Sequence, residues 1–157
     1  MCQEIVFSWF DGQTRYVLID QAPWSFLNSN AQFQSNSNEA GGILLGYRAG
    51  ANIHIISATG PLPGDRRSRI SFDRLDPGHQ IAASEAWATS GGRIDYIGDW
   101  HTHPQRVPTP SSKDYLEWKK LIASVHALHL FAIVGTSQVR IWLSSELDRK
   151  IVPAFRT

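Results

Sequence analysis

The sequence predicts one α+β domain, spanning residues 1–157, in which a mixed β-sheet is flanked by about three helices. Length and composition point this way, because 157 residues with 42% hydrophobic content are enough to bury one core. Strand-like and helix-like segments follow one another without repeats, low-complexity tracts or a linker. Their order is mixed, which favours an α+β arrangement over a doubly wound parallel sheet.

The first half of the chain is expected to form a hairpin, a helix and further strands. Asp11-Gly12 is a common turn signal between two apolar stretches. Trp24, Leu27 and Ala31 recur at helical spacing, and the Ser- and Asn-rich run that follows predicts the end of that helix. The expected elements are strands at 4–10 and 14–19, a helix from 20–23 to within 35–38, and strands at 42–47, 52–58 and 69–72.

The second half has stronger boundary signals. Asp76-Pro77 predicts a helix start and Gly91-Gly92 its end. The run at 128–134 is apolar enough for a central strand. The expected elements are a helix from 76–77 to 91–92, a strand at 94–103, a proline-rich loop through Pro110, a helix from about Ser111, and strands at 128–134 and 139–143.

Charge and cysteine content exclude several functional classes. The net charge is +1, from 15 basic and 14 acidic residues, so we expect no nucleic-acid partner. Cys2 is the only cysteine, which excludes an intrachain disulfide, a four-cysteine zinc site and a Cys-x-x-Cys redox centre. This cysteine usage fits a reducing cytoplasm. No apolar run reaches the length of a signal peptide or membrane span, so no membrane partner is expected.

The segment His101-Thr102-His103-Pro104 has the pattern of a zinc site with an open position. Side chains two apart in a strand point to the same face, so His101 and His103 project together. The proline-rich loop is expected to bring the first turn of the next helix, with Asp114, over that face. Unpaired N–H groups at a helix start favour an ionised carboxylate there. Two imidazoles and one carboxylate leave the fourth position of a tetrahedral zinc ion for water.

Each part of this motif also has a purely structural explanation. Ser111-Ser112-Lys113-Asp114 is the pattern of a capping box, in which a serine and an acid three residues later satisfy helix N–H groups. A His-x-His pair also arises by chance on a solvated strand face. The combination at this spacing is what favours a metal site.

These residues resemble the JAMM signature of the MPN-type zinc metalloproteases. Glu39 lies upstream, and His101-Thr102-His103-Pro104 is followed by six residues, Ser111, two residues and Asp114, so every signature position is matched. The stretches at 97–104 and 72–80 are similar to a small bacterial branch of the family. That branch includes deconjugating proteases encoded beside cGAS-like nucleotidyltransferases in anti-phage CBASS operons.

The resemblance implies a JAMM/MPN-like, cytidine-deaminase-like fold with a mixed curved sheet, and one Zn²⁺ ion. It implies His101, His103 and Asp114 as metal ligands. It also implies Glu39 as the general base and Ser111 as the hydroxyl that stabilises the oxyanion. From strand geometry alone, Asp99 shares the face of the two histidines and could orient an imidazole from behind.

The implied activity is that of a zinc-dependent (iso)peptidase acting on a flexible protein C-terminal tail. A cGAS-like nucleotidyltransferase is the first candidate substrate, and a ubiquitin-like or sulfur-carrier protein is the alternative. A non-catalytic MPN scaffold with a structural metal is an alternative of another class. A zinc nucleobase deaminase is excluded, because its Pro-Cys-x-x-Cys ligand set needs two cysteines.

Two further features have open interpretations. Arg66-Arg67-Ser68-Arg69 could bind an acidic partner or form a solvated loop. His79 could support the site or lie on a helix surface.

Overall fold

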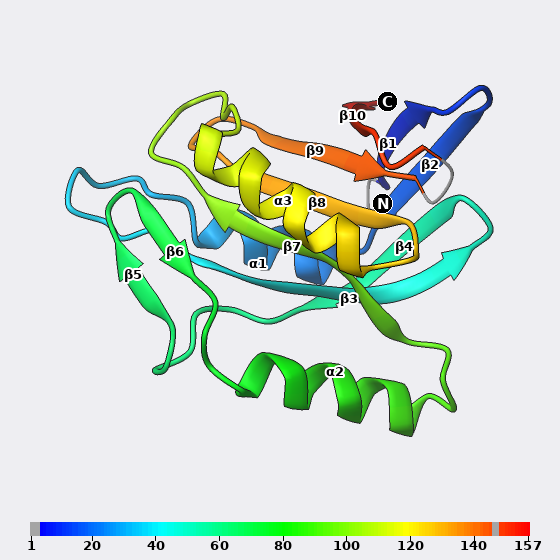
Figure 1. Ribbon diagram of the computed structural model, residues 1–157. Helices are drawn as coiled ribbons and strands as arrows, with labels where there is room; N and C mark the ends of the chain where they lie inside the picture. The colour runs from blue at the N-terminus through cyan, green and yellow to red at the C-terminus, as the bar shows by residue number, and fades with distance from the viewer. Residues whose placement is uncertain (1–3, 146–147) are drawn as a thin grey trace.

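The computed structural model describes residues 4–145 and 148–157 (Figure 1). The strands in this part of the chain are β1 (Ile5–Phe10), β2 (Thr14–Ile19), β3 (Gly41–Ala49), β4 (Asn52–Ala58), β5 (Arg66–Ser68), β6 (Ser71–Asp73), β7 (Asp95–Thr102), β8 (His129–Val134), β9 (Val139–Ser144) and β10 (Ile151–Arg156). The helices are α1 (Gln21–Ser29), α2 (Gly78–Thr89) and α3 (Ser112–Ser124). The α+β class and the mixed sheet with three helices are therefore as predicted.

The main sheet closes on itself as a barrel, whereas a mixed curved sheet flanked by helices was expected. Its strand order is β1-β10-β9-β8-β7-β3-β4-β2, and β2 pairs with β1. The β2–β4 and β7–β8 pairs are parallel. Closure depends on β10, which pairs with both β1 and β9. The sequence analysis missed this strand because Pro153 interrupts its short apolar run.

The hydrophobic core fills the barrel, and α1 packs against it through Leu27 and Trp24, while its other side is exposed (Figure 1). β8 is buried on both faces. Alternate residues of β8 face the barrel core, while Phe131 and Ile133 face outward beneath α3. Trp118 of α3 stacks on Phe131 with ring centroids 4.5 Å apart. α2 packs separately, on the outer face of β3. The outer face of β7 therefore lies between these two helices.

Two predicted boundaries are wrong for local reasons. α1 ends at Ser29 rather than within 35–38, because the side chains of Asn28, Ser29 and Asn30 donate hydrogen bonds to carbonyls of its last turns. Of the strand expected at 69–72, residues 69–70 form the turn of a hairpin, and only 71–72 are extended, as part of β6. β5 and β6 pair antiparallel around this turn and form a separate two-stranded sheet.

His79 is neither a surface residue nor one of the residues around the metal motif. Its ring is fully buried at the start of α2. Nε2 lies 2.7 Å from Asp65 Oδ2, and Nδ1 lies 2.6 Å from Thr59 Oγ1. These contacts anchor the chain that leads into the β5–β6 hairpin. Among the described residues, every helix is too short or too polar to cross a lipid bilayer.

Candidate active site

β7 presents the two histidines of the predicted metal motif. It pairs with β3 on one side and with β8 on the other, so its position is fixed along its whole length. His101 faces outward from the strand, whereas Thr102 is fully buried on the inner side. His103 follows the strand end and donates its N–H to the Val134 carbonyl at 3.0 Å. As predicted, the imidazoles converge, with their Nε2 atoms 3.1 Å apart.

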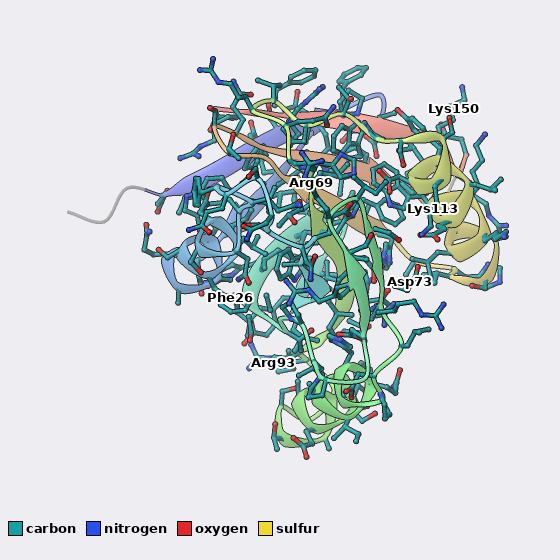
Figure 2. The ribbon with its side chains drawn as sticks, turned by 90° about the vertical axis from the view of Figure 1, so that its left-hand side faces the viewer. Phe26, Arg69, Asp73, Arg93, Lys113 and Lys150 are labelled. Atoms are coloured by element: carbon teal, nitrogen blue, oxygen red, sulfur yellow. The ribbon has the colours of Figure 1, made fainter. Side chains whose placement is uncertain are left out.

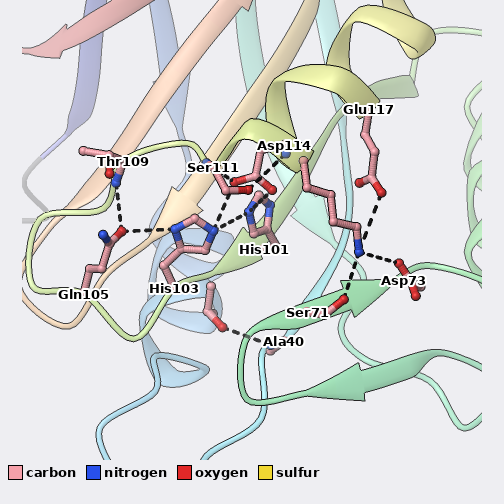
Figure 3. A network of polar contacts seen from close by, with 12 residues as sticks. Ala40, Ser71, Asp73, His101, His103, Gln105, Thr109, Ser111, Asp114 and Glu117 are labelled. Carbon is pink, nitrogen blue, oxygen red and sulfur yellow. Dashed lines mark hydrogen bonds and ion pairs between the residues drawn. The ribbon is translucent and has the colours of Figure 1, made fainter.

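Asp114 caps the start of α3 and also contacts both imidazoles. The N–H of Asp114 donates to Ser111 Oγ at 3.1 Å, and the N–H of Ser111 donates to Asp114 Oδ2 at 2.8 Å, which completes a capping box. The same carboxylate lies 3.2 Å from His101 Nε2 and 3.1 Å from His103 Nε2 (Figure 3). The capping explanation and the metal-site explanation are therefore compatible.

The donor set formed by His101, His103 and Asp114 fits a zinc ion. The closest atoms of the three side chains lie 3.1–3.2 Å from one another. A tetrahedral zinc ion with bonds of about 2.0–2.2 Å separates its ligand atoms by roughly 3.3–3.5 Å, so only a small expansion is needed. Two imidazole nitrogens and a carboxylate are also donors that zinc prefers.

Gln105 contacts the His103 ring on the side away from Asp114, a contact that was not predicted from the sequence. Its Oε1 lies 3.1 Å from His103 Nδ1 and accepts the N–H of Thr109 at 3.0 Å (Figure 3). When Nδ1 donates its proton to this oxygen, Nε2 keeps its lone pair for the metal. The only signal in the sequence was an amide side chain two residues after a candidate ligand.

Thr102 explains how the metal strand and the Glu39 segment are kept together. Its hydroxyl donates to Gln32 Oε1 at 2.8 Å and accepts the N–H of Ala40 at 3.0 Å. The Thr102 N–H donates to the Ala40 carbonyl at 2.9 Å. Thr102 lies between the two histidines but points to the opposite face of β7. There it is bonded to Ala40, the residue that follows Glu39.

Glu39 lies just before β3, and its side chain is only 4% exposed. One carboxylate oxygen lies within 4.8 Å of ring nitrogens of both His101 and His103. Asp114 contacts both rings more closely and is therefore the better third ligand. Burial raises the pKa of Glu39 to about 7, although the charge of His103 opposes this and that of Asp114 adds to it. A carboxyl group with this pKa can accept and return a proton near neutrality.

The pKa values of Asp114 and His103 are shifted in opposite directions. Burial alone would raise the pKa of Asp114, but its contacts with His101 and His103, together with the N–H of Ser111, hold it far below its usual range. Burial alone would lower the pKa of His103, but contact with Asp114 outweighs this and raises it. A fully ionised carboxylate is therefore ready for a cation, and metal binding is expected to displace a proton from His103.

The prediction that Asp99 orients an imidazole is not supported by its contacts. It shares the outward face with His101, as strand geometry required, but its oxygens have other partners. Oδ2 accepts from Tyr96 Oη at 2.5 Å and contacts His129 Nε2 at 2.8 Å, and Oδ1 pairs with Arg74 at 2.9 Å. The orienting role belongs to Gln105 instead.

A groove of about 590 Å³ contains these residues and runs between the β5–β6 hairpin and α3. Its lining includes all three residues of β6 and the α3 residues Lys113, Asp114, Glu117, Trp118 and Leu121. Lys113 spans the groove, because its Nζ donates to Ser71 Oγ at 2.9 Å and contacts Asp73 Oδ1 at 3.1 Å (Figures 2 and 3). We call this contact the Lys113 bridge.

Residues 29–145 match the family described as prokaryotic homologs of the JAB domain. The chain belongs to this family. The match spans most of the chain and includes Glu39, both histidines, Ser111 and Asp114. Because the JAB family is hydrolytic, the chain is a hydrolase by family.

Curated JAB relatives have a more specific name. A Pseudomonas aeruginosa protein (strain BWHPSA011 / Pa011) named CD-NTase/cGAS isopeptidase is 37% identical over 117 residues, which are 74% of each chain. An Escherichia coli protein (strain TW11681) of the same name is 32% identical over 148 residues, covering 94% of this chain and 92% of its own. The solution structure of protein DSY2949 from Desulfitobacterium hafniense matches with a TM-score of 0.59 over 88% of both chains, at 20% identity, which supports the fold alone.

Proposed function

We propose that this chain is a zinc-dependent isopeptidase. In this proposal it hydrolyses the amide that joins the C-terminal tail of a CD-NTase/cGAS-like nucleotidyltransferase to a target, as part of an anti-phage CBASS system. The names and coverage of the relatives support the substrate class. A cytoplasmic setting, expected from the single cysteine, belongs to the same proposal.

The observation that carries the proposal is the convergence of four side chains in one groove. Glu39, His101, His103 and Asp114 come from three separate segments of the chain, yet they meet beside the same space. A site that only held a structural metal would not need a buried carboxyl group with a pKa near 7 standing just outside the ligand set.

Glu39 is the proposed proton carrier of the reaction. A zinc ion held by the three ligands would supply Lewis-acid chemistry, which polarises an amide carbonyl and makes water nucleophilic near neutral pH. Glu39 accepts the proton that the attacking water loses, and then donates it to the nitrogen of the departing amine. Its pKa of about 7 suits both transfers, because neither protonation state is strongly favoured at neutral pH.

Ser111 is the proposed donor to the oxyanion that forms when water attacks the carbonyl. Its oxygen accepts the N–H of Asp114, which leaves the hydroxyl hydrogen available to a group in the groove. A single donor of this kind typically contributes about 10²–10³ in turnover.

The unpaired edge of β6 is a suitable docking place for an extended tail. In the part of the chain that the structure describes, β6 pairs only with β5, and Ser71, Phe72 and Asp73 of β6 line the groove together with the proposed metal ligands. A tail added there as a further strand would gain main-chain hydrogen bonds and bring a carbonyl toward the site.

The alternatives of the sequence analysis use the same residues. A ubiquitin-like or sulfur-carrier tail would occupy the same groove, but the names of the relatives favour the nucleotidyltransferase. A non-catalytic scaffold is disfavoured because base, ligands and hydroxyl are all in place around one groove.

The proposal is tested with a purified conjugate in which the tail of a CD-NTase is joined by an amide to a target protein. Mass spectrometry should show release of a free C-terminal carboxyl group, which gains the oxygen of the added water, and of a free amine, which gains a hydrogen. A zinc chelator should stop cleavage, and added zinc should restore it.

Two further measurements separate the alternatives. Glu39→Gln should bind one zinc ion per chain and cleave nothing. A zinc-loaded parent protein that cleaves no conjugate would identify a scaffold, and cleavage restricted to a ubiquitin-like conjugate would identify the other substrate class.

A further inference from the structure

The backbone N–H and carbonyl of Glu39 are bonded to the β5–β6 hairpin, whereas those of the next residue, Ala40, are bonded to Thr102 of β7. The β3–β7 ladder begins at Gly41, so Glu39 lies outside it. Its N–H donates to the Ser68 carbonyl at 2.7 Å. Its carbonyl accepts from Arg67 Nε, also at 2.7 Å. Both backbone groups of the proposed base therefore end on neighbouring residues of β5.

These backbone contacts matter because the Glu39 carboxylate has no direct support of its own. Within residues 4–145 and 148–157, no hydrogen bond or ion pair reaches its oxygens. Its direction is therefore set by its main chain and by packing. A 2.7 Å bond from a charged guanidinium is stronger than one between neutral groups, so the contact with Arg67 is well suited to fix the peptide plane after Glu39.

Arg67 has no competing role among its described contacts. Its second contact, 3.5 Å to the Asn38 carbonyl, is directed at the same segment. In the part of the chain that the structure describes, no carboxylate lies within ion-pair distance of it. Its side chain does not line the groove.

We propose that Arg67 is a positioning residue for the reaction. Its guanidinium holds the main chain of Glu39 and so directs the carboxylate toward the groove; this rests on the proposed role of Glu39 as the base. A displacement of about 1 Å in a reacting group can lower the rate by about 10²-fold. Removal of Arg67 should therefore lower kcat by at least about tenfold, with KM changed by less than about twofold, because substrate does not touch it.

The test compares Arg67→Ala and Arg67→Lys with Arg66→Ala. Arg66 is the matched control, because it is an exposed arginine of the same strand and makes no described side-chain hydrogen bond. The zinc-loaded proteins are assayed on the amide conjugate for kcat and KM, with zinc content and Tm measured in parallel. Arg67→Ala is also assayed with added guanidinium ion, which can occupy the vacated place.

Arg67→Ala should lose kcat, keep one zinc ion per chain, and recover part of its activity with guanidinium. The kcat of Arg67→Lys should lie between those of Arg67→Ala and the parent. The kcat of Arg66→Ala should equal that of the parent. An unchanged kcat in Arg67→Ala would overturn the proposal. An equal change of KM in Arg67→Ala and Arg66→Ala would also overturn it, because that result indicates that the hairpin binds an acidic partner.

Hydrogen exchange gives a readout that does not need activity. Peptides that cover residues 36–41 should exchange about tenfold faster in Arg67→Ala than in the parent or Arg66→Ala, because one of the two contacts that hold the main chain of Glu39 is lost. If the parent cleaves no conjugate, the proposed function fails, and exchange alone then decides whether Arg67 holds this segment. Unchanged exchange would overturn the inference.

Discussion

Glu39 and Asp114 carry the same functional group, but their surroundings give them opposite chemistry. Asp114 contacts two imidazoles and a backbone N–H, and its pKa lies far below the usual range. Glu39 is buried without such partners, and its pKa rises to about 7. One carboxylate is thereby kept ionised for a metal, while the other is available for proton transfer.

The raised pKa of Glu39 predicts a pH-dependent stability of the metal-free protein. The unfolded group titrates near 4.5 and the folded one near 7, so between these values the folded state binds more protons and stability falls as pH rises. We expect a loss of about 1–2 kcal/mol across this window, less than the full shift would give, because the carboxylate faces a wet groove.

This prediction is checked by urea unfolding between pH 4.5 and 8 on chelated protein. Glu39→Gln should remove the Glu39 part of the slope. Glu117→Gln, which changes a half-exposed carboxylate of α3, should retain the parental slope. Identical slopes in Glu39→Gln and the parent would contradict the assigned protonation.

Gln105 should affect metal affinity through His103. Gln105→Ala frees the imidazole to rotate and removes its proton acceptor, and loss of such a partner typically weakens metal binding about 10–100-fold. Competition with a chromophoric chelator measures the zinc Kd. Gln105→Glu keeps an acceptor for His103 Nδ1 and should bind close to the parental level. An unchanged Kd in Gln105→Ala would show that the ring is held by packing alone.

At the scale of elements, β7 can hold the ligands only because its neighbours approach very closely. A Cβ on Gly98 would lie 2.1 Å from the Leu130 carbonyl oxygen of β8. That oxygen belongs to the backbone of β8, which is paired with β7 and β9 on its two sides. It therefore cannot move aside as a flexible side chain would. The closeness of the two strands is therefore part of the metal site.

Gly98→Ala should force β7 away from β8 and destabilise the protein by at least about 2 kcal/mol. It should also weaken zinc binding, because His101 lies three residues further along the strand. Urea unfolding and a zinc titration test both effects. Ser57→Ala, at an exposed position of β4, should change stability by less than about 0.5 kcal/mol. A parental unfolding midpoint in Gly98→Ala would disprove the close contact.

Elements whose sequence pattern is complete within a short stretch of the chain were predictable from the sequence. The apolar alternation and turn of β1–β2, the helical stripe of α1 and the capping sequence of α3 each lie within a short window. The β5–β6 hairpin was not predicted correctly, because strands of three residues have too little periodicity. β10 was missed because pairing with β1 and β9, rather than its own residues, defines it.

The same distinction applies to the site. The spacing of His101, His103 and Asp114 was enough to predict their convergence. The contacts of Arg67 with Glu39 and of Gln32 with Thr102 had no local signal, because the partners lie 28 and 70 residues apart in the chain. Contacts of this kind are set by the assembled fold and cannot be inferred from spacing.

For the whole molecule, closure of the barrel is the feature on which the core depends. Ala154 of β10 is buried in the core, while its neighbour Phe155 is 64% exposed. Ala154→Asp places a charge inside the barrel and should cost more than about 3 kcal/mol. Phe155→Asp, on the same strand but facing outward, should cost less than about 1 kcal/mol. Thermal unfolding distinguishes the two variants. An equal loss of stability in both would contradict the orientation of β10.

Zinc should stabilise the whole molecule, because its proposed ligands come from β7, from the residue that follows it and from α3. At a free zinc concentration of about 100 times Kd, binding adds about 2.7 kcal/mol, or roughly 5–10 °C in Tm for a chain of this size. Asp114→Asn keeps an acceptor for the Ser111 N–H but loses the anionic ligand, so it should lose most of this increase. A parental increase in Asp114→Asn would exclude Asp114 as a ligand.

The Lys113 bridge has a consequence for the order of events in catalysis. It joins α3 to β6 across the space where the tail is proposed to lie. A free peptide could be threaded beneath it end first, but an isopeptide conjugate has a folded protein on each side of the scissile bond. Under the proposed function such a substrate would have to enter from the side. The contacts of Lys113 with Ser71 and Asp73 would then have to break first, so unattached peptides and conjugates would differ in their rates of entry.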